Sequence, residues 1–332
     1  MHHSLSYFTD KTVLVTGAAG FIGSHLCDRL LALGARVVGV DNFMTGRREN
    51  LAHIESENFT FIEADVITQA DSYLPGKLKL DAVLHFASPA SPPRYQAEPV
   101  ATYLVNTVGT HNLLQYLRST NPQARFVFAS TSEIYGDPLE HPQKESYWGN
   151  VNPNGERSCY DESKRMGETI CGVHERDFKM DIRIVRIFNT YGPRMDPLDG
   201  RVIPNLINQA LNQEAYTIFG DGSQTRSYCF IDDEVEGILR LAALEGLKGE
   251  TINIGNADEY TVLQTVAEVH QVVRPEAGEP KLEYQKLPAD DPTRRRPDIS
   301  KAKKILEWEP QTSFQDGLKP TITYFSSLLK AA

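Results

Sequence analysis

Two side chains near the middle of the chain, Tyr160 and Lys164, have the types and the spacing of a proton-transfer pair. They lie four residues apart, so on a helix they share one face. A nearby ammonium favours the phenolate and lowers the tyrosine pKa, which lets the phenol oxygen exchange a proton with a hydroxyl group near neutral pH. A YxxxK pair is common by chance, and a lone match indicates no more than a surface tyrosine above a lysine.

A cluster of polar residues, Ser130-Thr131-Ser132-Glu133, follows an apolar run that predicts a buried strand over Arg125–Ser130. The cluster comes directly before the Tyr160 helix in the expected order of elements. A hydroxyl there can hold the oxygen that Tyr160 deprotonates. Glu133 can orient a substrate or relay a proton, directly or through water. The alternative interpretation of Glu133 is a solvated carboxylate near a strand end.

A glycine-rich run, GAAGFIG, contains Gly17, Gly20 and Gly23 and stands between a predicted strand and a predicted helix. Glycine lets the backbone turn tightly and approach a pyrophosphate, whose charge is stabilised by free N–H groups and the helix dipole. The spacing is GxxGxxG, which differs from the GxGxxG of the standard dinucleotide fingerprint. By itself this run is also compatible with an ordinary strand–helix turn.

The ends of the next strands supply further groups for a dinucleotide. Asp41 stands 24 residues after Gly17, where a carboxylate binds both ribose hydroxyls and repels a 2′-phosphate, so NAD is favoured over NADP. Arg47 and Arg48 follow closely and leave this preference open; their alternative is a solvated turn. Asp65-Val66 suits the adenine edge, and Phe86-Ala87-Ser88 suits the pyrophosphate and the nicotinamide ribose. These successive strand ends predict an NAD site.

The elements that must position these groups alternate regularly in the first half of the chain. Leucine and isoleucine recur at helical spacing from Ile22 to Leu33, and Val100–Leu117 and Tyr160–Phe178 predict further helices. This order predicts an α/β, Rossmann-type, doubly wound parallel sheet over residues 1–188. Residues 189–332 predict a smaller C-terminal α+β substrate lobe that ends in a helix near Phe314–Lys330. The predicted strands are Thr12–Thr16, Arg36–Val40, Phe59–Ala64, Asp81–Phe86, Arg125–Ser130 and Asp181–Arg186.

Composition excludes several classes of protein. The 332 residues carry a formal net charge of −10, which argues against a nucleic-acid binder because that function needs a large basic footprint. No uncharged apolar stretch approaches the roughly 18 residues of a membrane span. The four cysteines (Cys27, Cys159, Cys171, Cys229) form no CxxC and no cluster with histidine, so we expect free thiols and no metal site. With no signal pattern at the N-terminus, we expect a cytoplasmic protein.

The glycine run, Asp41, the hydroxyl cluster and the YxxxK pair together resemble the short-chain dehydrogenase/reductase superfamily, and the chain length fits its extended, sugar-nucleotide branch. A narrower resemblance, from about Asp10 to Leu328, is to the UDP-glucuronate decarboxylases, also called UDP-xylose synthases. Two departures from that family are Ser163, where it usually has glycine, and Cys229–Asp232, where it has a Gln-Tyr-Val-Ser type of sequence. The runs that carry the narrower resemblance are STSEIYGDP from Ser130, HPQKESYWGNVNP from His141, GERSCYDESKR from Gly155, RIFNTYGPRM from Arg186, DGRV from Asp199, GDGSQTRSY from Gly220 and DDPTRRRPDISKAKKILEWEP from Asp290.

The resemblance implies a role for each matched residue. The helices over Val100–Leu117 and Tyr160–Phe178 resemble the pair that forms the dimer in that branch, so a homodimer is implied. For Asn106 a structural role at the active-site strand is implied. Tyr95 either closes over the sugar or is loop packing. The implied catalytic residues are Thr131, Glu133, Tyr160, Lys164 and Arg295. The implied substrate contacts are Tyr95, Ser132, Asn189, Arg201, Arg226 and Arg295. The implied NAD contacts are Gly17, Gly20, Phe21, Ile22, Gly23, Asp41, Asn42, Phe43, Thr45, Gly46, Asp65, Val66, Ala87, Ser88, Tyr160, Lys164, Thr190 and Arg194.

The chemistry that the resemblance implies has no net redox change. Hydride leaves C4 of UDP-glucuronate for NAD while Tyr160 takes the hydroxyl proton; the 4-ketone then permits loss of CO₂, and the hydride returns to give UDP-xylose. Ser132 stands where related 4,6-dehydratases have an acidic residue, which weakens a dehydratase interpretation. The alternatives are a C4 epimerase or 4,6-dehydratase on the same scaffold, or a non-catalytic NAD-binding regulator.

Overall fold

The computed structural model describes residues 3–287 and 292–331, and its largest element is a sheet of seven parallel strands. The strand order across the sheet is β3-β2-β1-β4-β5-β6-β11, with the direction of winding reversed between β1 and β4. This is the expected doubly wound arrangement, and its reversal point opens a crevice at the carboxyl ends of the strands. The strands are β1 (Thr12–Thr16), β2 (Arg36–Asp41), β3 (Phe59–Glu63), β4 (Ala82–His85), β5 (Arg125–Thr131), β6 (Asp181–Ile187) and β11 (Thr251–Ile254).

Side chains alternate between two hydrophobic cores, one on each face of the sheet. In β1, Val13 and Val15 pack into one core with Leu26 of the first helix, whereas Leu14 packs into the other with Leu114. This period of two follows from strand geometry, and it explains why strands covered on both faces read as nearly continuous apolar runs. The fold prediction is confirmed.

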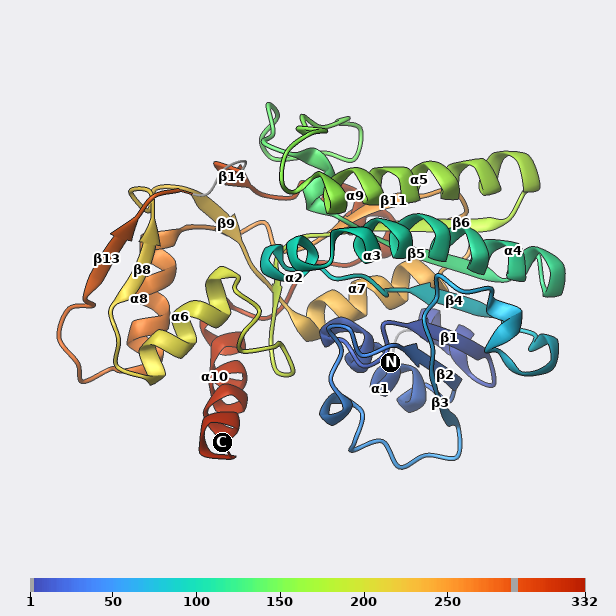
Figure 1. The fold of residues 1–332 in the computed structure, drawn as a ribbon, viewed down its shortest axis with the longest axis horizontal. Coiled ribbons are helices and arrows are strands. Elements are labelled where there is room, and N and C mark those ends of the chain that lie inside the picture. The colour runs from blue at the N-terminus through green and yellow to red at the C-terminus, as the bar shows by residue number, and fades with distance from the viewer. Residues whose placement is uncertain (1–2, 288–291, 332) are drawn as a thin grey trace.

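Helices cover both faces of the sheet (Figure 1): α1 and α7 contribute side chains to one core, and α4 and α5 contribute to the other. The first helix begins at Phe21 and has no acidic residue in its first turn and no side-chain cap. The helices of this part are α1 (Phe21–Ala32), α2 (Pro92–Ala97), α3 (Pro99–Leu104), α4 (Thr110–Thr120), α5 (Ser158–Phe178), α7 (Ile231–Ala243) and α9 (Ser300–Leu306). Short 3₁₀ turns are η1 (His3–Phe8), η2 (Arg48–Asn50), η3 (Ala70–Ser72), η4 (Pro75–Lys77) and η6 (Ser132–Tyr135).

The helix expected over Val100–Leu117 is interrupted. A π-helical turn, η5 (Val105–Gly109), separates α3 from α4. Such turns insert a residue into the helical ladder and are frequent at functional sites. Here the turn contains Asn106, whose side chain is completely buried.

The second part of the molecule is smaller and mixes short strands with helices, at the left of Figure 1. It holds a parallel pair, β8 with β13, and a three-stranded sheet in the order β12-β9-β14. A further parallel pair, β7 with β10, joins the two parts. The elements are β7 (Thr190–Tyr191), α6 (Val202–Leu211), β8 (Tyr216–Phe219), β9 (Thr225–Ser227), β10 (Cys229–Phe230), β12 (Glu259–Thr261), α8 (Val262–Val273), β13 (Leu282–Gln285), β14 (Arg294–Arg295) and α10 (Phe314–Ala331).

The six predicted strands of the large sheet form within one residue of their expected ends. The seventh, β11, was not predicted: the chain leaves the sheet after β6 and returns to pair β11 with β6 over Thr251–Ile254. The helices α7 and α9 return with it, so the chain crosses between the two parts more than once. The first two residues of the run from Asp290, Asp290 and Asp291, lie outside the described residues.

Candidate active site

The glycine-rich loop needs glycine for backbone reasons at two positions. Gly17 has a φ of 72°, and a Cβ there would lie 2.7 Å from the carbonyl oxygen of Phe86. A Cβ on Gly23 would lie 2.0 Å from the carbonyl oxygen of Gly17. Side chains at these positions would push β1, the loop and α1 apart. The loop therefore leads β1 directly into α1, whose uncapped N-terminal N–H groups suit a phosphate.

Asp41 ends β2 beside this loop and is fixed by backbone N–H groups. Its Oδ2 accepts from the Ala19 amide at 3.0 Å, and its Oδ1 accepts from the Phe43 amide at 2.8 Å. Burial raises the pKa of this carboxyl, and the backbone donors oppose that rise. A small cavity of about 70 Å³ lies against it. Of the predicted cofactor residues, this cavity is lined by Gly17, Gly20, Asp41, Asn42, Thr45, Asp65, Val66, Ala87 and Ser88.

A cavity of about 780 Å³ continues from there along the carboxyl ends of the strands toward the smaller part of the molecule. Its size and its position at the reversal point are those of a ligand site in this kind of fold. The predicted site residues that line it are Gly17, Gly20, Phe21, Ile22, Gly23, Thr45, Ser88, Thr131, Ser132, Glu133, Tyr160, Lys164, Asn189, Thr190, Arg194, Arg201, Arg226 and Arg295.

Tyr160, Lys164 and Thr131 meet in the middle of this cavity. Lys164 Nζ donates to the Ala129 carbonyl oxygen at 2.8 Å and lies 5.8 Å from the centroid of the Tyr160 ring. Burial lowers the pKa of Lys164 to about 7. Burial also raises the pKa of Tyr160, and the hydrogen bond with Thr131 opposes only part of that rise. The tyrosine pKa is therefore raised, and not lowered as expected, because burial has the largest effect on it.

Glu133 is held by two arginines from different parts of the chain. Arg295 binds both carboxylate oxygens in a fork, with Nη2 2.9 Å from Oε2, and Arg157 Nη2 lies 2.7 Å from the same oxygen. Burial by itself would raise the pKa of Glu133, but the two guanidinium groups hold it at about 2. The alternative interpretation, a solvated carboxylate, is therefore wrong. Asp161 lies nearby, and burial together with the charge of Glu133 raises its pKa to about 8.

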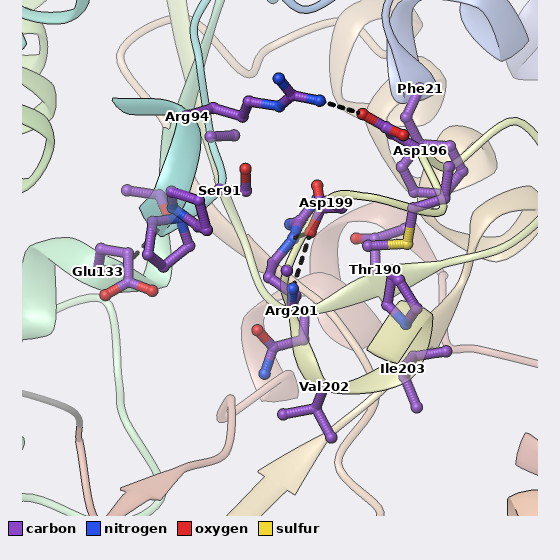
Figure 2. A pocket seen from close by; sticks show the side chains of 18 of the residues that line it. Phe21, Ser91, Arg94, Glu133, Thr190, Asp196, Asp199, Arg201, Val202 and Ile203 are labelled. Carbon is purple, nitrogen blue, oxygen red and sulfur yellow. Dashed lines mark hydrogen bonds and ion pairs between the residues drawn. The ribbon is translucent and has the colours of Figure 1, made fainter. Parts of the chain in front are cut away.

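Two further ion pairs line the cavity, and Figure 2 shows both as dashed lines. Arg201 binds Asp199 through two hydrogen bonds of 2.5 and 2.9 Å. Arg94 of α2 binds Asp196 at 2.8 Å, so this pair joins the large sheet domain to the loop that follows β7. Arg226, which is 7% exposed, contributes a further cation and adds to the positive potential around Glu133.

Three predicted contacts lie behind the cavities. Phe43 stacks against Phe61 with ring centroids 5.3 Å apart, under the guanidinium of Arg48. Gly46 lies against Asp41, where a Cβ would be 2.8 Å from both carboxylate oxygens. Tyr95 is 1% exposed and stacks on the Tyr160 ring, with centroids 5.0 Å apart. Tyr95 thus packs from α2 on the catalytic tyrosine candidate, and its contact with a sugar stays a prediction.

Some groups in the site were not predicted. Arg157 stands one helical turn before Tyr160, and that spacing is the signal that would have found it. Asn106 was expected at the active-site strand, but its Nδ2 donates to Ser163 Oγ at 2.9 Å on α5. Ser163 Oγ in turn donates to the Tyr160 carbonyl oxygen at 2.9 Å. The departure at Ser163 therefore adds a contact between the π-helical turn and the helix that carries Tyr160.

Two kinds of feature are absent from residues 3–287 and 292–331. No group of three or more His, Cys, Asp or Glu side chains in these residues is arranged to hold a metal ion. Nor does any helix within the same ranges combine the length and the apolar character that crossing a membrane requires.

Comparison with known proteins places these features in a family. The model of the NAD dependent epimerase/dehydratase family matches residues 13–255. UDP-glucuronic acid decarboxylase 4 of Arabidopsis thaliana is 49% identical over 307 residues, which cover 92% of this chain and 66% of the relative. UDP-glucuronic acid decarboxylase 6 of the same organism is 45% identical over 320 residues, which cover 96% of this chain and 90% of the relative. The chain thus spans about two thirds of the first relative and most of the second.

A solved structure extends the comparison to the fold. The UDP-glucuronic acid 4-epimerase of Bacillus cereus, in complex with UDP-glucuronic acid and NAD, superposes with a TM-score of 0.85 and 31% identity. The match covers 96% of this chain and 99% of that one. The chain therefore belongs to the NAD dependent epimerase/dehydratase family, within the group of its members named UDP-glucuronic acid decarboxylases.

Proposed function

We propose that this protein is an NAD-dependent UDP-glucuronate decarboxylase, which converts UDP-glucuronate to UDP-xylose and CO₂ with no net redox change. The observation that carries the proposal is the Glu133 carboxylate in the fork of Arg295, inside the cavity that also holds Tyr160 and Thr131. This arrangement brings together a proton-transfer group for C4 and a cationic site for a second carboxylate. The names of the relatives support the same substrate.

The cofactor of this proposal is NAD, which supplies a hydride acceptor at C4 and returns the hydride at the end of the cycle. The residues present fit it. The glycine loop brings bare backbone to the cavity, and the Asp41 carboxylate faces the small cavity that a ribose and adenine would fill. Arg48, which raised the question of NADP, is engaged with Glu63 at 2.7 Å. Asp41 therefore favours NAD over a cofactor with a 2′-phosphate.

At C4, Tyr160 accepts the hydroxyl proton while the Thr131 hydroxyl holds the same oxygen. Lys164 donates to the Ala129 carbonyl at the end of the active-site strand, which keeps a cationic group within reach of the developing oxyanion. Burial disfavours the phenolate of Tyr160 when no substrate is bound. The proton therefore moves in concert with oxidation, when charge at the sugar oxygen is compensated by these donors.

The residues that act at C6 and C5 are Arg295 and Glu133, whose ion pair opens when the substrate binds. A substrate carboxylate competes for the guanidinium of Arg295 because a fork geometry suits any carboxylate. When Arg295 turns to the substrate, Glu133 loses its strongest stabilising charge and gains a negative neighbour, so its pKa rises from about 2. Glu133 then takes up a proton from water and, once CO₂ has left, is placed to deliver that proton to C5. Arg201 and Arg226, which line the same cavity, bind the diphosphate, and Asn189 and Ser132 contact the sugar.

The deciding experiment is incubation of the purified protein with UDP-glucuronate, without added reductant, followed by nucleotide-sugar analysis. Release of CO₂ and formation of a UDP-pentose are expected. UDP-galacturonate as the product would make the protein a C4 epimerase, the reaction named for the Bacillus cereus neighbour. Ser132, in place of an acid, argues against 4,6-dehydration. Bound NAD without turnover of any sugar nucleotide would indicate a regulator.

We also propose that the protein acts as a homodimer in the cytoplasm. Large apolar side chains are exposed on the outer surface of the helices that carry η5 and Tyr160, and a second copy would cover them. Free thiols at all four cysteines support a reducing compartment. The molecular mass in solution tests the dimer. The exposed side chains are Val100, Tyr103, Val108, Met166 and Phe178.

A further inference from the structure

We propose that Gln143 is a positioning residue, which fixes the backbone after Arg295 so that the Arg295 guanidinium binds Glu133 and can turn from it to the C6 carboxylate of the substrate. This inference rests on the proposed function. The two partners of the ion pair, Glu133 and Arg295, lie in different parts of the molecule. Glu133 follows β5 of the large sheet, whereas Arg295 lies on β14 of the smaller part, paired with Arg226 on β9. Their ion pair therefore depends on how the two parts dock.

The chain crosses between the parts immediately after Arg295. Ser227 Oγ donates to the Arg295 carbonyl oxygen at 3.2 Å, which is the last contact of β14 with β9. Residues 296–298 then run back toward the large sheet and pair in parallel with Gln143, opposite Pro297. Gln143 belongs to the run HPQKESYWGNVNP, which singled out this family in the sequence but was given no chemical role.

Gln143 binds this crossing segment with its backbone and its side chain together. Its amide donates to the Arg296 carbonyl oxygen at 2.9 Å, and its carbonyl oxygen accepts from the Asp298 amide at 2.8 Å. Its side-chain Oε1 accepts from the Arg296 amide at 2.8 Å. Three hydrogen bonds thus hold the two residues on either side of Pro297. The Arg296 amide directly follows Arg295 in the backbone. Its hydrogen bond to the Gln143 side chain therefore fixes the backbone at the carboxyl end of Arg295.

Gln143 is itself fixed on the side of the large sheet. Its Nε2 donates to the Glu140 carbonyl oxygen at 2.8 Å, and the side chain is 1% exposed. Asn253 of β11 donates from Nδ2 to the Gln143 carbonyl oxygen at 3.0 Å and to the Asp298 carbonyl oxygen at 3.2 Å. Tyr135, two residues after Glu133, donates from its hydroxyl to Asn253 Oδ1 at 2.7 Å. The same buried network therefore holds both sides of the Glu133–Arg295 pair.

The chemical consequence is confined to the substrate carboxylate. Replacing Oε1 by an apolar group leaves the Arg296 amide without its acceptor in a place that water does not reach, and the segment must shift. A shift of about 1 Å in a positioning group can cost about 100-fold in rate. The glycine loop, Asp41 and Tyr160 lie on other elements, so NAD binding and the binding of UDP without a sugar acid should not change.

The test is a double-mutant cycle of Gln143→Met and Arg295→Lys, with steady-state turnover of UDP-glucuronate as the readout. Methionine keeps the length of glutamine and removes Oε1. We expect Gln143→Met to lower kcat/KM by about 10- to 100-fold in the parent and by less than about 3-fold when Arg295 is already lysine. The Kd of UDP-glucuronate should rise, whereas the Kd of UDP and the NAD content should stay at parental values.

A second substitution of Gln143 and a control substitution elsewhere complete the test. Gln143→Glu retains an oxygen for the Arg296 amide and, when its carboxyl is protonated, a donor to the Glu140 carbonyl oxygen. It should therefore keep more turnover than Gln143→Met at low pH, and it also serves if the methionine variant does not fold. Glu259→Gln is the matched control, because Glu259 links His141 of the same run, at 3.1 Å, to Thr225 of β9 without binding residues 296–298. It should retain parental turnover.

The outcomes separate this inference from the function on which it rests. If the parent protein makes no UDP-pentose, the proposed function fails and the cycle is not reached. If the parent decarboxylates, and Gln143→Met lowers kcat/KM equally in both Arg295 backgrounds, the role of Gln143 is structural and the inference is overturned. An equal loss of UDP and UDP-glucuronate affinity would overturn it as well.

Discussion

The site has two ends, the small cavity and the large one, and each contains a largely buried carboxylate that is stabilised in a different way. Asp41, at the cofactor end, is bound by the neutral amides of Ala19 and Phe43, and burial raises its pKa. Glu133, at the substrate end, is bound by Arg157 and Arg295, which hold its pKa at about 2 despite burial. Backbone dipoles suit a group that only accepts hydrogen bonds from a ligand. Movable cations suit a group whose proton affinity must change during a reaction.

The residues that bind the carboxylate lie close to it in the sequence at the cofactor end and far from it at the substrate end. Ala19, Asp41 and Phe43 are within one strand–helix–strand unit. Arg157 and Arg295 lie 24 and 162 residues from Glu133. The contacts of Asp41 therefore lie within one local unit, whereas the contact of Glu133 with Arg295 requires the two parts of the molecule to dock. Changes at one end should leave the other end largely unaffected.

The largest effect is expected where the two ends meet. Tyr160→Phe keeps the ring that stacks on Tyr95 but removes the oxygen that exchanges a proton, so kcat should fall by at least about 10³-fold. NAD content and the Kd of UDP-glucuronate should stay close to those of the parent, as measured by absorbance and calorimetry. Turnover within about 10-fold of the parent would mean that the active site has been placed wrongly.

A change at the substrate end comes next. Glu133→Gln removes the negative charge between Arg157 and Arg295 and cannot deliver a proton, so turnover should fall by about 10²-fold. Formation of the 4-keto sugar should be slowed much less, because Tyr160 and Thr131 are unchanged. Rapid-reaction absorbance of the reduced cofactor, compared with CO₂ release, separates the two steps. Equal slowing of both steps would contradict the separation of the ends.

A change at the cofactor end should have a smaller effect and a different character. Asp41→Ala should weaken NAD binding by about 10- to 100-fold, since hydrogen bonds to a charged group contribute about 1.5–3 kcal/mol. Binding of NADP should not weaken, because the variant also loses the repulsion between the carboxylate and the 2′-phosphate. Calorimetric Kd values for both cofactors are the measurement, with turnover at saturating NAD as the control. Equal affinity of the parent for NAD and NADP would remove the role given to Asp41.

The smallest effect on activity is expected for a substitution of Glu234, which lies behind the cavity wall. Glu234 of α7 is fully buried beside Thr190 and Cys229, and burial raises its pKa well above the usual 4.5. The folded state therefore keeps a proton that the unfolded chain loses above about pH 4.5, so stability falls as the pH rises between these two pKa values. Glu234→Gln removes this loss, which is at most about 1.4 kcal/mol per pH unit.

Chemical denaturation of both proteins at several pH values measures this slope. The glutamine variant should be more stable than the parent at pH 8, and its advantage should shrink toward pH 5. Turnover at pH 7.5 should stay within about 2-fold of the parent. Parallel stability curves for the two proteins would show that Glu234 ionises normally.

Short-range chemistry explains what was predictable from the sequence. The six strands follow from apolar runs, the loop from the backbone freedom of Gly17 and Gly23, and the common face of Tyr160 and Lys164 from a spacing of four on a helix. Each of these depends on residues close together in the chain. The resemblance to a family extended this to Glu133 and Arg295, which the structure brings together in one ion pair.

What only the tertiary structure decided depends on burial and on contacts across long separations. The return of β11 to the large sheet, the second arginine on Glu133, the stacking of Tyr95 on Tyr160 and the bonds of Gln143 to residues 296–298 all join distant segments. The direction of the Tyr160 pKa belongs to this class too. The sequence shows a lysine one turn away, but it cannot reveal the loss of water around the phenol, which has the largest effect on the Tyr160 pKa and raises it.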